Sequence, residues 1–163
     1  MAKYLSILVN GGKQIKPSII KTIINADGTE ENKADITDKV NSRLGYVPEK
    51  DEDIEIAPEN LKAIFEGMKG VTSESGGTAY GVFGHFNIEV GGKTGTAQKG
   101  NSDNALFAGF APFDNPEIAV ICVIENGGNS AIACYPARDV IAQYFGMNEG
   151  TIDENIDAVP FVQ

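Results

Sequence analysis

The sequence has little of the chemistry on which metal and thiol sites depend. It contains a single histidine, His85, which excludes a site built from several histidine ligands. It contains two cysteines, Cys122 and Cys134, and their spacing matches no disulfide framework. Buried free thiols are therefore favoured over a disulfide.

Long apolar runs and an excess of basic residues are also missing. The longest apolar run has seven residues, at 118–124, which is too short to span a bilayer, and no signal peptide is expected. With 13 Lys and Arg against 23 Asp and Glu, the net charge of −10 argues against nucleic acid as a partner. Binding to phosphates requires basic side chains, so we interpret this charge as a solvated surface.

A nucleotide-binding loop is excluded as well. Gly91-Gly92-Lys93-Thr94 has the ending of a phosphate-binding loop, but Asn87 stands where the leading glycine would be required. Neither a cofactor nor a metal is therefore predicted for this chain.

What the sequence does have is Lys93-Thr94-Gly95 followed by Thr96. Lys-Thr-Gly is one of three short motifs of serine-acylating enzymes that act on penicillin-like or D-Ala-D-Ala substrates. In a strand at the edge of a cleft, Thr94 and Thr96 would face one side and bind a substrate carboxylate, with the charge of Lys93 beside them. Gly95 would leave room for close packing of the backbone, and the Thr96 N–H could point at a developing oxyanion.

The motif belongs to an ordered series of segments that spans residues 4–146. The other members are Asn10-Gly11-Gly12, residues 16–21, Phe65-Glu66-Gly67-Met68, Gly77-Thr78-Ala79, residues 105–112, residues 115–120 and a helix led by Pro136. This series resembles the carboxy-terminal half of the transpeptidase domain of class B penicillin-binding proteins, the penicillin-binding protein 2-like group. The order of the segments is far more specific than any one of them.

The resemblance implies a partial penicillin-binding transpeptidase fold, similar to that of serine β-lactamases. It implies a parent D,D-transpeptidase that cross-links peptidoglycan stem peptides ending in D-Ala-D-Ala through a serine acyl-enzyme, and that β-lactams inhibit. It gives catalytic roles to Lys93 and Thr96, and substrate binding to Thr94, Gly95, Thr96 and Gln98. It also places the parent on the extracytoplasmic face of the bacterial cytoplasmic membrane, held by an amino-terminal anchor outside this chain.

Two further matches to the motifs of these enzymes are interpreted as coincidental. Ser18 and Lys21 form a Ser-x-x-Lys, but in a β-branched run predicted to be a strand, where positions i and i+3 point to opposite faces. Ser102 and Asn104 form a Ser-x-Asn, but they follow Lys-Thr-Gly where the family order has them precede it, in a predicted turn. The nucleophile and its base are therefore expected to be missing, and the chain alone is expected to be inactive.

Two alternatives to an inactive part of a transpeptidase remain open from the sequence. The first is a self-contained acyl-serine hydrolase that uses Ser18 and Lys21. The second is a non-catalytic scaffold that keeps only the fold of the cleft wall. Labelling by a fluorescent penicillin would distinguish them.

The predicted fold class is α+β, with an antiparallel sheet covered by helices. The expected helices are a first one from Tyr4 ending at Asn10-Gly11, one near Pro58 with a core face, and one at 136–145 stopped by Gly146. The helix near Pro58 is expected to bury Leu61, Ile64, Phe65 and Met68, and the last helix Ala137, Val140, Ile141, Tyr144 and Phe145. Strands are expected at 18–24, 86–97, 105–111 and 118–126, a polar surface excursion at 27–53, and a turn at 114–116.

Residues 1–147 are assigned to the carboxy-terminal part of the transpeptidase domain, and 148–163 to an acidic mobile tail. Tyr80, Phe83 and Phe86 are assigned to core packing in preference to a substrate groove. The strand at 118–126 is expected to pair with sequence upstream of Tyr4. Its open edge makes self-association possible.

Overall fold

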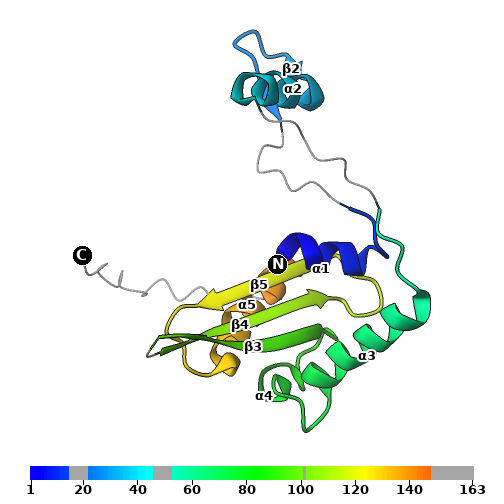
Figure 1. Cartoon of the computed structure of the whole chain (residues 1–163), viewed down its shortest axis with the longest axis vertical. Coiled ribbons are helices and arrows are strands. Elements are labelled where there is room, and N and C mark those ends of the chain that lie inside the picture. The colour runs from blue at the N-terminus through cyan, green and yellow to red at the C-terminus, as the bar shows by residue number, and fades with distance from the viewer. Residues whose placement is uncertain (15–21, 46–52, 101, 148–163) are drawn as a thin grey trace.

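A computed structural model of the chain describes residues 1–14, 22–45, 53–100 and 102–147. Its centre is a three-stranded antiparallel sheet formed by β3 (Gly91–Lys99), β4 (Ser102–Ala111) and β5 (Ile118–Ile124), in the order β3-β4-β5 (Figure 1). The register pairs Lys93 with Ala108 and Ala108 with Ile121. The predicted turn at 114–116 is confirmed, since it lies between the antiparallel strands β4 and β5.

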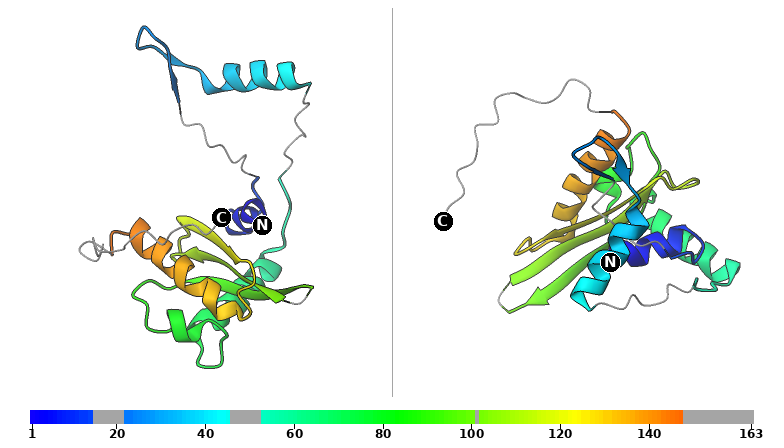
Figure 2. Two further views of the ribbon diagram at one scale, coloured as in Figure 1. Left: turned by 90° about the vertical axis from the view of Figure 1, so that its left-hand side faces the viewer. Right: turned by 90° about the horizontal axis from the view of Figure 1, so that it is seen from above.

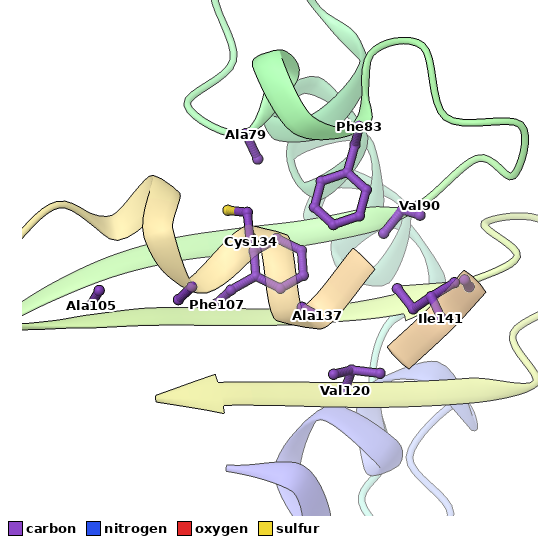
Figure 3. Packing of buried hydrophobic residues seen from close by; sticks show 11 residues of the cluster. Ala79, Phe83, Val90, Ala105, Phe107, Val120, Cys134, Ala137 and Ile141 are labelled. Carbon is purple, nitrogen blue, oxygen red and sulfur yellow. The ribbon is translucent and has the colours of Figure 1, made fainter. Parts of the chain in front are cut away.

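One face of the sheet is covered by α4 (Tyr80–Phe83), the 3-10 helix η1 (Ser130–Ala133) and α5 (Cys134–Tyr144). Figure 3 shows α5 lying across the strands, with Ile141 and Ala137 directed at the sheet. Phe107 is fully buried there and stacks on Phe83 with ring centroids 5.1 Å apart. Because side chains alternate along β4, its odd-numbered residues supply this core.

The other face packs against α1 (Ala2–Val9) and α3 (Pro58–Ser73). Proline at the first turn of α3 fits a position where no backbone N–H is needed. The buried members of this second core are Leu5, Met68 and Phe110, and the ring of Phe65 lies 5.2 Å from that of Phe110. This core is small, and Ile64 and Val123 remain exposed on the same side of the sheet.

The remaining described elements are β1 (Ile23–Ile24), β2 (Glu30–Glu31) and α2 (Lys33–Leu44). The views of Figures 1 and 2 agree that this hairpin and helix stand apart from the sheet. The predicted polar surface excursion at 27–53 is largely exposed in its described residues, but it contains a strand and a helix that were not predicted. Asn32 caps α2 by accepting a hydrogen bond from the N–H of Ala34, and Gly45 ends it in the left-handed conformation.

The fold class of α+β is confirmed, and the differences lie at element boundaries. Residues 86–90 are not strand, so the strand predicted at 86–97 begins only at Gly91. The last helix begins at Cys134, and its Val140 and Tyr144 are half exposed although they were predicted to be core. Of the strand expected at 18–24, only 23–24 lies within the described residues as strand, and the tail at 148–163 lies outside them.

Candidate functional site

The Lys-Thr-Gly motif lies on β3, which is an edge strand of the sheet among the described residues. Lys93 pairs with Ala108 and Thr94 with Phe107, so the two side chains point to opposite faces. Thr94 is buried whereas Lys93 and Thr96 are exposed. Two threonines of the motif therefore share one face, as expected, and the lysine occupies the other.

Lys93 opens onto a groove of about 550 Å³ between α1 and α3, not onto the face of the threonines. Its Nζ donates a hydrogen bond to the carbonyl oxygen of Thr94. The groove is predominantly apolar, and its lining residues are Met1, Tyr4, Leu5, Leu8, Ala63, Ile64, Gly67, Met68, Val71, Lys93, Ala108 and Ile121. The expectation that Lys93 would lie beside the threonine hydroxyls was wrong for this chain, because consecutive strand residues alternate between faces.

On the opposite face, the hydroxyl of Thr94 meets the hydroxyl of Thr78. Their oxygens are 2.6 Å apart, the length of a good O–H···O hydrogen bond. Sequence reasoning used Gly77-Thr78-Ala79 only as part of a resemblance and gave Thr78 no role. The available signal was the presence of a hydroxyl residue in a glycine-rich turn directly after α3.

The turn that carries Thr78 is fastened to the end of α3. A Cβ at Gly77 would lie 2.4 Å from the carbonyl oxygens of Gly70 and Val71, so only glycine allows this approach. The N–H of Ala79 donates to the carbonyl oxygen of Val71 at 3.0 Å. These contacts fix the backbone on both sides of Thr78.

Two contacts connect α3 to the start of β3. The hydroxyl of Thr72 donates to the carbonyl oxygen of Val90. The Nζ of Lys69 lies 2.8 Å from a carboxylate oxygen of Glu89, and this hydrogen bond raises the pKa of Lys69. The turn, α3 and β3 are thereby held in one arrangement.

The other predicted site residues follow along β3. Thr96 and Gln98 are exposed, on the same face as Thr94. A Cβ at Gly95 would meet only Cβ of Leu106, at an ordinary 3.6 Å. The expectation that Gly95 serves close backbone packing was therefore wrong within this chain. Gly92 has that property instead, because its Cβ would lie 2.6 Å from the ring of Phe107.

The Ser-x-Asn match has a visible structural role. Ser102 and Asn104 open β4 and do not lie in the turn where they were predicted. The hydroxyl of Ser102 bonds to the amide oxygen of Asn126, and the amide oxygen of Asn104 accepts from the N–H of Asn126 at 3.1 Å. Both residues fasten the end of β5, while Ser18 and Lys21 lie outside the described residues.

The aromatic and thiol residues near the site mainly pack in or against the hydrophobic core. Phe83 is buried, and Phe86 packs edge-on against it at 6.0 Å, which confirms the assignment of both to the core. His85 is exposed and contacts the ring of Tyr80 at 5.9 Å. Cys122 and Cys134 are free thiols, as predicted, and burial raises the pKa of Cys134 to about 11.

Comparison with known proteins identifies the family to which this sequence is similar. Residues 1–142 match the family described as the penicillin-binding protein transpeptidase domain. The chain is 32% identical over 161 residues to the peptidoglycan D,D-transpeptidase MrdA of Haemophilus influenzae, covering 88% of this chain and 23% of that protein. It is 27% identical to penicillin-binding protein 2A of Bacillus subtilis, covering 98% of this chain and 24% of that protein.

Solved structures of penicillin-binding proteins resemble the fold of this chain. PBP2 of Pseudomonas aeruginosa, solved in complex with WCK 5153, superposes with a TM-score of 0.70 and 31% identity over 94% of this chain and 30% of that one. Penicillin-binding protein 2B of Streptococcus pneumoniae, at 21% identity and a TM-score of 0.64, shows the fold alone. The chain spans about a quarter of the length of the curated relatives named here.

Proposed function

Because this chain belongs to the penicillin-binding protein transpeptidase family, we propose that it forms the Lys-Thr-Gly wall of the active site in a peptidoglycan D,D-transpeptidase. Such an enzyme would cross-link stem peptides ending in D-Ala-D-Ala through a serine acyl-enzyme, and β-lactams would acylate the same serine. One observation carries this proposal. Lys93-Thr94-Gly95-Thr96 lies on an edge strand, with Thr94 and Thr96 on one face.

Both side chains and backbone groups of β3 would bind the substrate. The hydroxyls of Thr94 and Thr96 would donate to the substrate carboxylate, and the Thr96 N–H would form half of an oxyanion hole. Gly95 would let the substrate backbone approach the strand, because no neighbour in this chain crowds that position. Gln98 would lie at the rim of the cleft.

The nucleophilic serine and its base would come from sequence outside these 163 residues. The only Ser-x-x-Lys in the chain is Ser18 to Lys21, which does not lie in the described part of the fold. The groove between α1 and α3 is predominantly apolar, and Lys93 is the charged side chain among its lining residues. The serine would approach the open edge of β3, which the side chains of Lys93 and Thr94 flank from opposite faces, and Lys93 would join its hydrogen-bond network from that edge.

The location of the protein follows from the same proposal. In the described parts of the chain no helix is both long and apolar enough to cross a membrane. We place the transpeptidase site on the extracytoplasmic face of the bacterial cytoplasmic membrane, where stem peptides occur, with an anchor supplied by sequence outside this chain.

A fluorescent penicillin tests the proposal. The 163-residue chain alone should form no covalent adduct, because binding groups and half of an oxyanion hole cannot supply the covalent step. The full-length protein that contains it should be labelled, with a mass increase of one acyl group. Labelling of the chain that is lost in Ser18→Ala would support a self-contained hydrolase. Absence of labelling in both proteins would support a non-catalytic scaffold.

A further inference from the structure

Thr78 and Thr94 form a pair of hydroxyls between the turn after α3 and the edge strand. Their oxygens are 2.6 Å apart, and Thr94 is only 6% exposed while Thr78 is exposed. A buried threonine whose hydroxyl is held by one specific partner has little freedom to reorient. The state of Thr78 therefore decides what the hydroxyl of Thr94 can do.

The direction of the hydrogen bond between Thr78 and Thr94 determines whether Thr94 can donate to a ligand. Each hydroxyl carries one hydrogen and two lone pairs, and only one hydrogen can lie between the two oxygens. If Thr94 donates to Thr78, only lone pairs of Thr94 remain for a ligand, and these repel a carboxylate. If Thr78 donates to Thr94, the hydrogen of Thr94 is free to bond to a carboxylate, and this charge-assisted bond is the stronger arrangement.

The backbone around Thr78 is fixed well enough for such a role. Gly77 packs directly on the carbonyl oxygens of Gly70 and Val71, and its N–H donates to the carbonyl oxygen of Glu74 at 2.8 Å. The N–H of Ala79 donates to Val71. The hydroxyl of Thr78 is therefore presented to β3 by a rigid turn.

We propose that Thr78 is a positioning residue that donates to Thr94 and thereby makes the Thr94 hydroxyl a donor to the substrate carboxylate. The inference rests on the proposed transpeptidase function and deepens it by a residue that acts through another. The effect of a Thr78 substitution on acylation should therefore require both the hydroxyl of Thr94 and the carboxylate of the ligand.

The test uses the full-length protein and the rate of acylation by a penicillin. Thr78→Val keeps the shape of the side chain and removes the hydroxyl, so acylation should slow about 3- to 10-fold, the range for one lost hydrogen bond. Thr78→Ala should behave similarly, and Thr78→Ser should remain within about twofold of the wild type because it keeps the donor. In a Thr94→Val background, Thr78→Val should add nothing, since coupled residues are not additive.

A penicillin methyl ester, which lacks the carboxylate, separates positioning from a structural role. The ratio of variant to wild-type acylation should return to about one with the ester. Melting of the full-length Thr78 variants should match that of the full-length wild type. Equal slowing with acid and ester, additive effects with Thr94→Val, or no rescue by serine would each overturn the inference. A wild-type protein that penicillin does not acylate would overturn the proposed function itself, whereas a normally acylated Thr78→Val variant would overturn only this inference.

Discussion

At the scale of single residues, neighbours on β3 face different surroundings. Thr94 is buried against Thr78, and Lys93 opens onto the groove beside α1. Strand alternation alone produces this division, so one short motif supplies hydroxyls to one side of the sheet and a cation to the other. The proposed roles of these residues therefore separate in mutation.

Thr94→Val and Thr96→Val in the full-length protein should each slow acylation by a penicillin. Charge-assisted hydrogen bonds to a buried carboxylate contribute about 1.5–3 kcal/mol, which corresponds to roughly 10- to 150-fold. Ser102→Ala is the control, because its hydroxyl contacts only Asn126 in the described structure and should leave the rate nearly unchanged. If Ser102→Ala slowed acylation as much as the threonine changes, interpreting Ser102 to Asn104 as a coincidental match would be wrong.

Cys134 should resist alkylation in the folded chain. Burial, with a smaller effect from the neighbouring Cys122, raises the pKa of its thiol to about 11, so at pH 8 only about a thousandth is thiolate. The rate with iodoacetamide should rise about tenfold per pH unit from 8 to 10. Mass spectrometry of the folded chain should find Cys122, which is less buried, modified first. Faster modification of Cys134 at pH 8 would contradict this.

At the scale of elements, the pattern of apolar residues predicted the helices and strands that form the core. It did not predict α2, which does not pack against the sheet. The strands around Phe107 and Val120, and the helix containing Ile141, have apolar residues at the required spacing. α2 is charged and buries almost none of its side chains. The residues in the sequence that indicate this helix are therefore those at its two ends, Asn32 and Gly45. Local caps stabilise such a helix without leaving a periodic apolar pattern.

The candidate site was predicted unevenly for a related reason. The spacing of Thr94 and Thr96 follows from strand geometry and was correctly expected to place them on one face. The partner of Thr94 comes from a turn that is distant in sequence, and no periodicity encodes such a contact. The environment of Lys93 depends on where α1 packs, which the motif itself does not determine.

Glycines of β3 offer a prediction at this scale. Gly92→Ala should destabilise the chain by about 1–3 kcal/mol, since a Cβ there would lie 2.6 Å from the ring of Phe107. Gly95→Ala should leave the melting temperature unchanged or slightly higher, because its surroundings have room and alanine restricts the unfolded chain. Thermal melts of the two variants in the full-length protein measure the difference.

The same pair separates packing from substrate access. In the full-length protein, Gly95→Ala should slow acylation although it does not destabilise the fold, because a methyl group on the Lys93 face of β3 would narrow the approach to the open edge of the strand. Equal melting and equal acylation in Gly95→Ala would remove the proposed role of this glycine.

At the scale of the whole molecule, the chain exposes surfaces that usually require a partner. The described sheet ends at β5, whose residues 118–124 contain no charge and no proline. Val123 on this strand is 51% exposed, and Ile121 of the same strand lines the predominantly apolar groove. Open strand edges and contiguous apolar area both favour association.

The isolated chain should therefore form dimers or larger assemblies at micromolar concentration, measured by light scattering. Val123→Lys should reduce association, because a charged side chain on an edge strand discourages pairing. Gln143→Lys adds the same charge on the exposed side of α5 and should leave association unchanged. A monomer that persists on concentration and melts cooperatively would refute the prediction.

The meander β3-β4-β5 also has a consequence for the order of folding. Its strands are consecutive in sequence and joined by short turns, so each pairing closes a small loop at low entropic cost. α1 must instead return to β4 and β5 from the other end of the chain. Contacts that are local in sequence form fastest, so pulse-labelled hydrogen exchange should find the amides of β4 protected before those of α1. The strand that carries Lys93-Thr94-Gly95 would then be one of the first parts of this protein to acquire its shape.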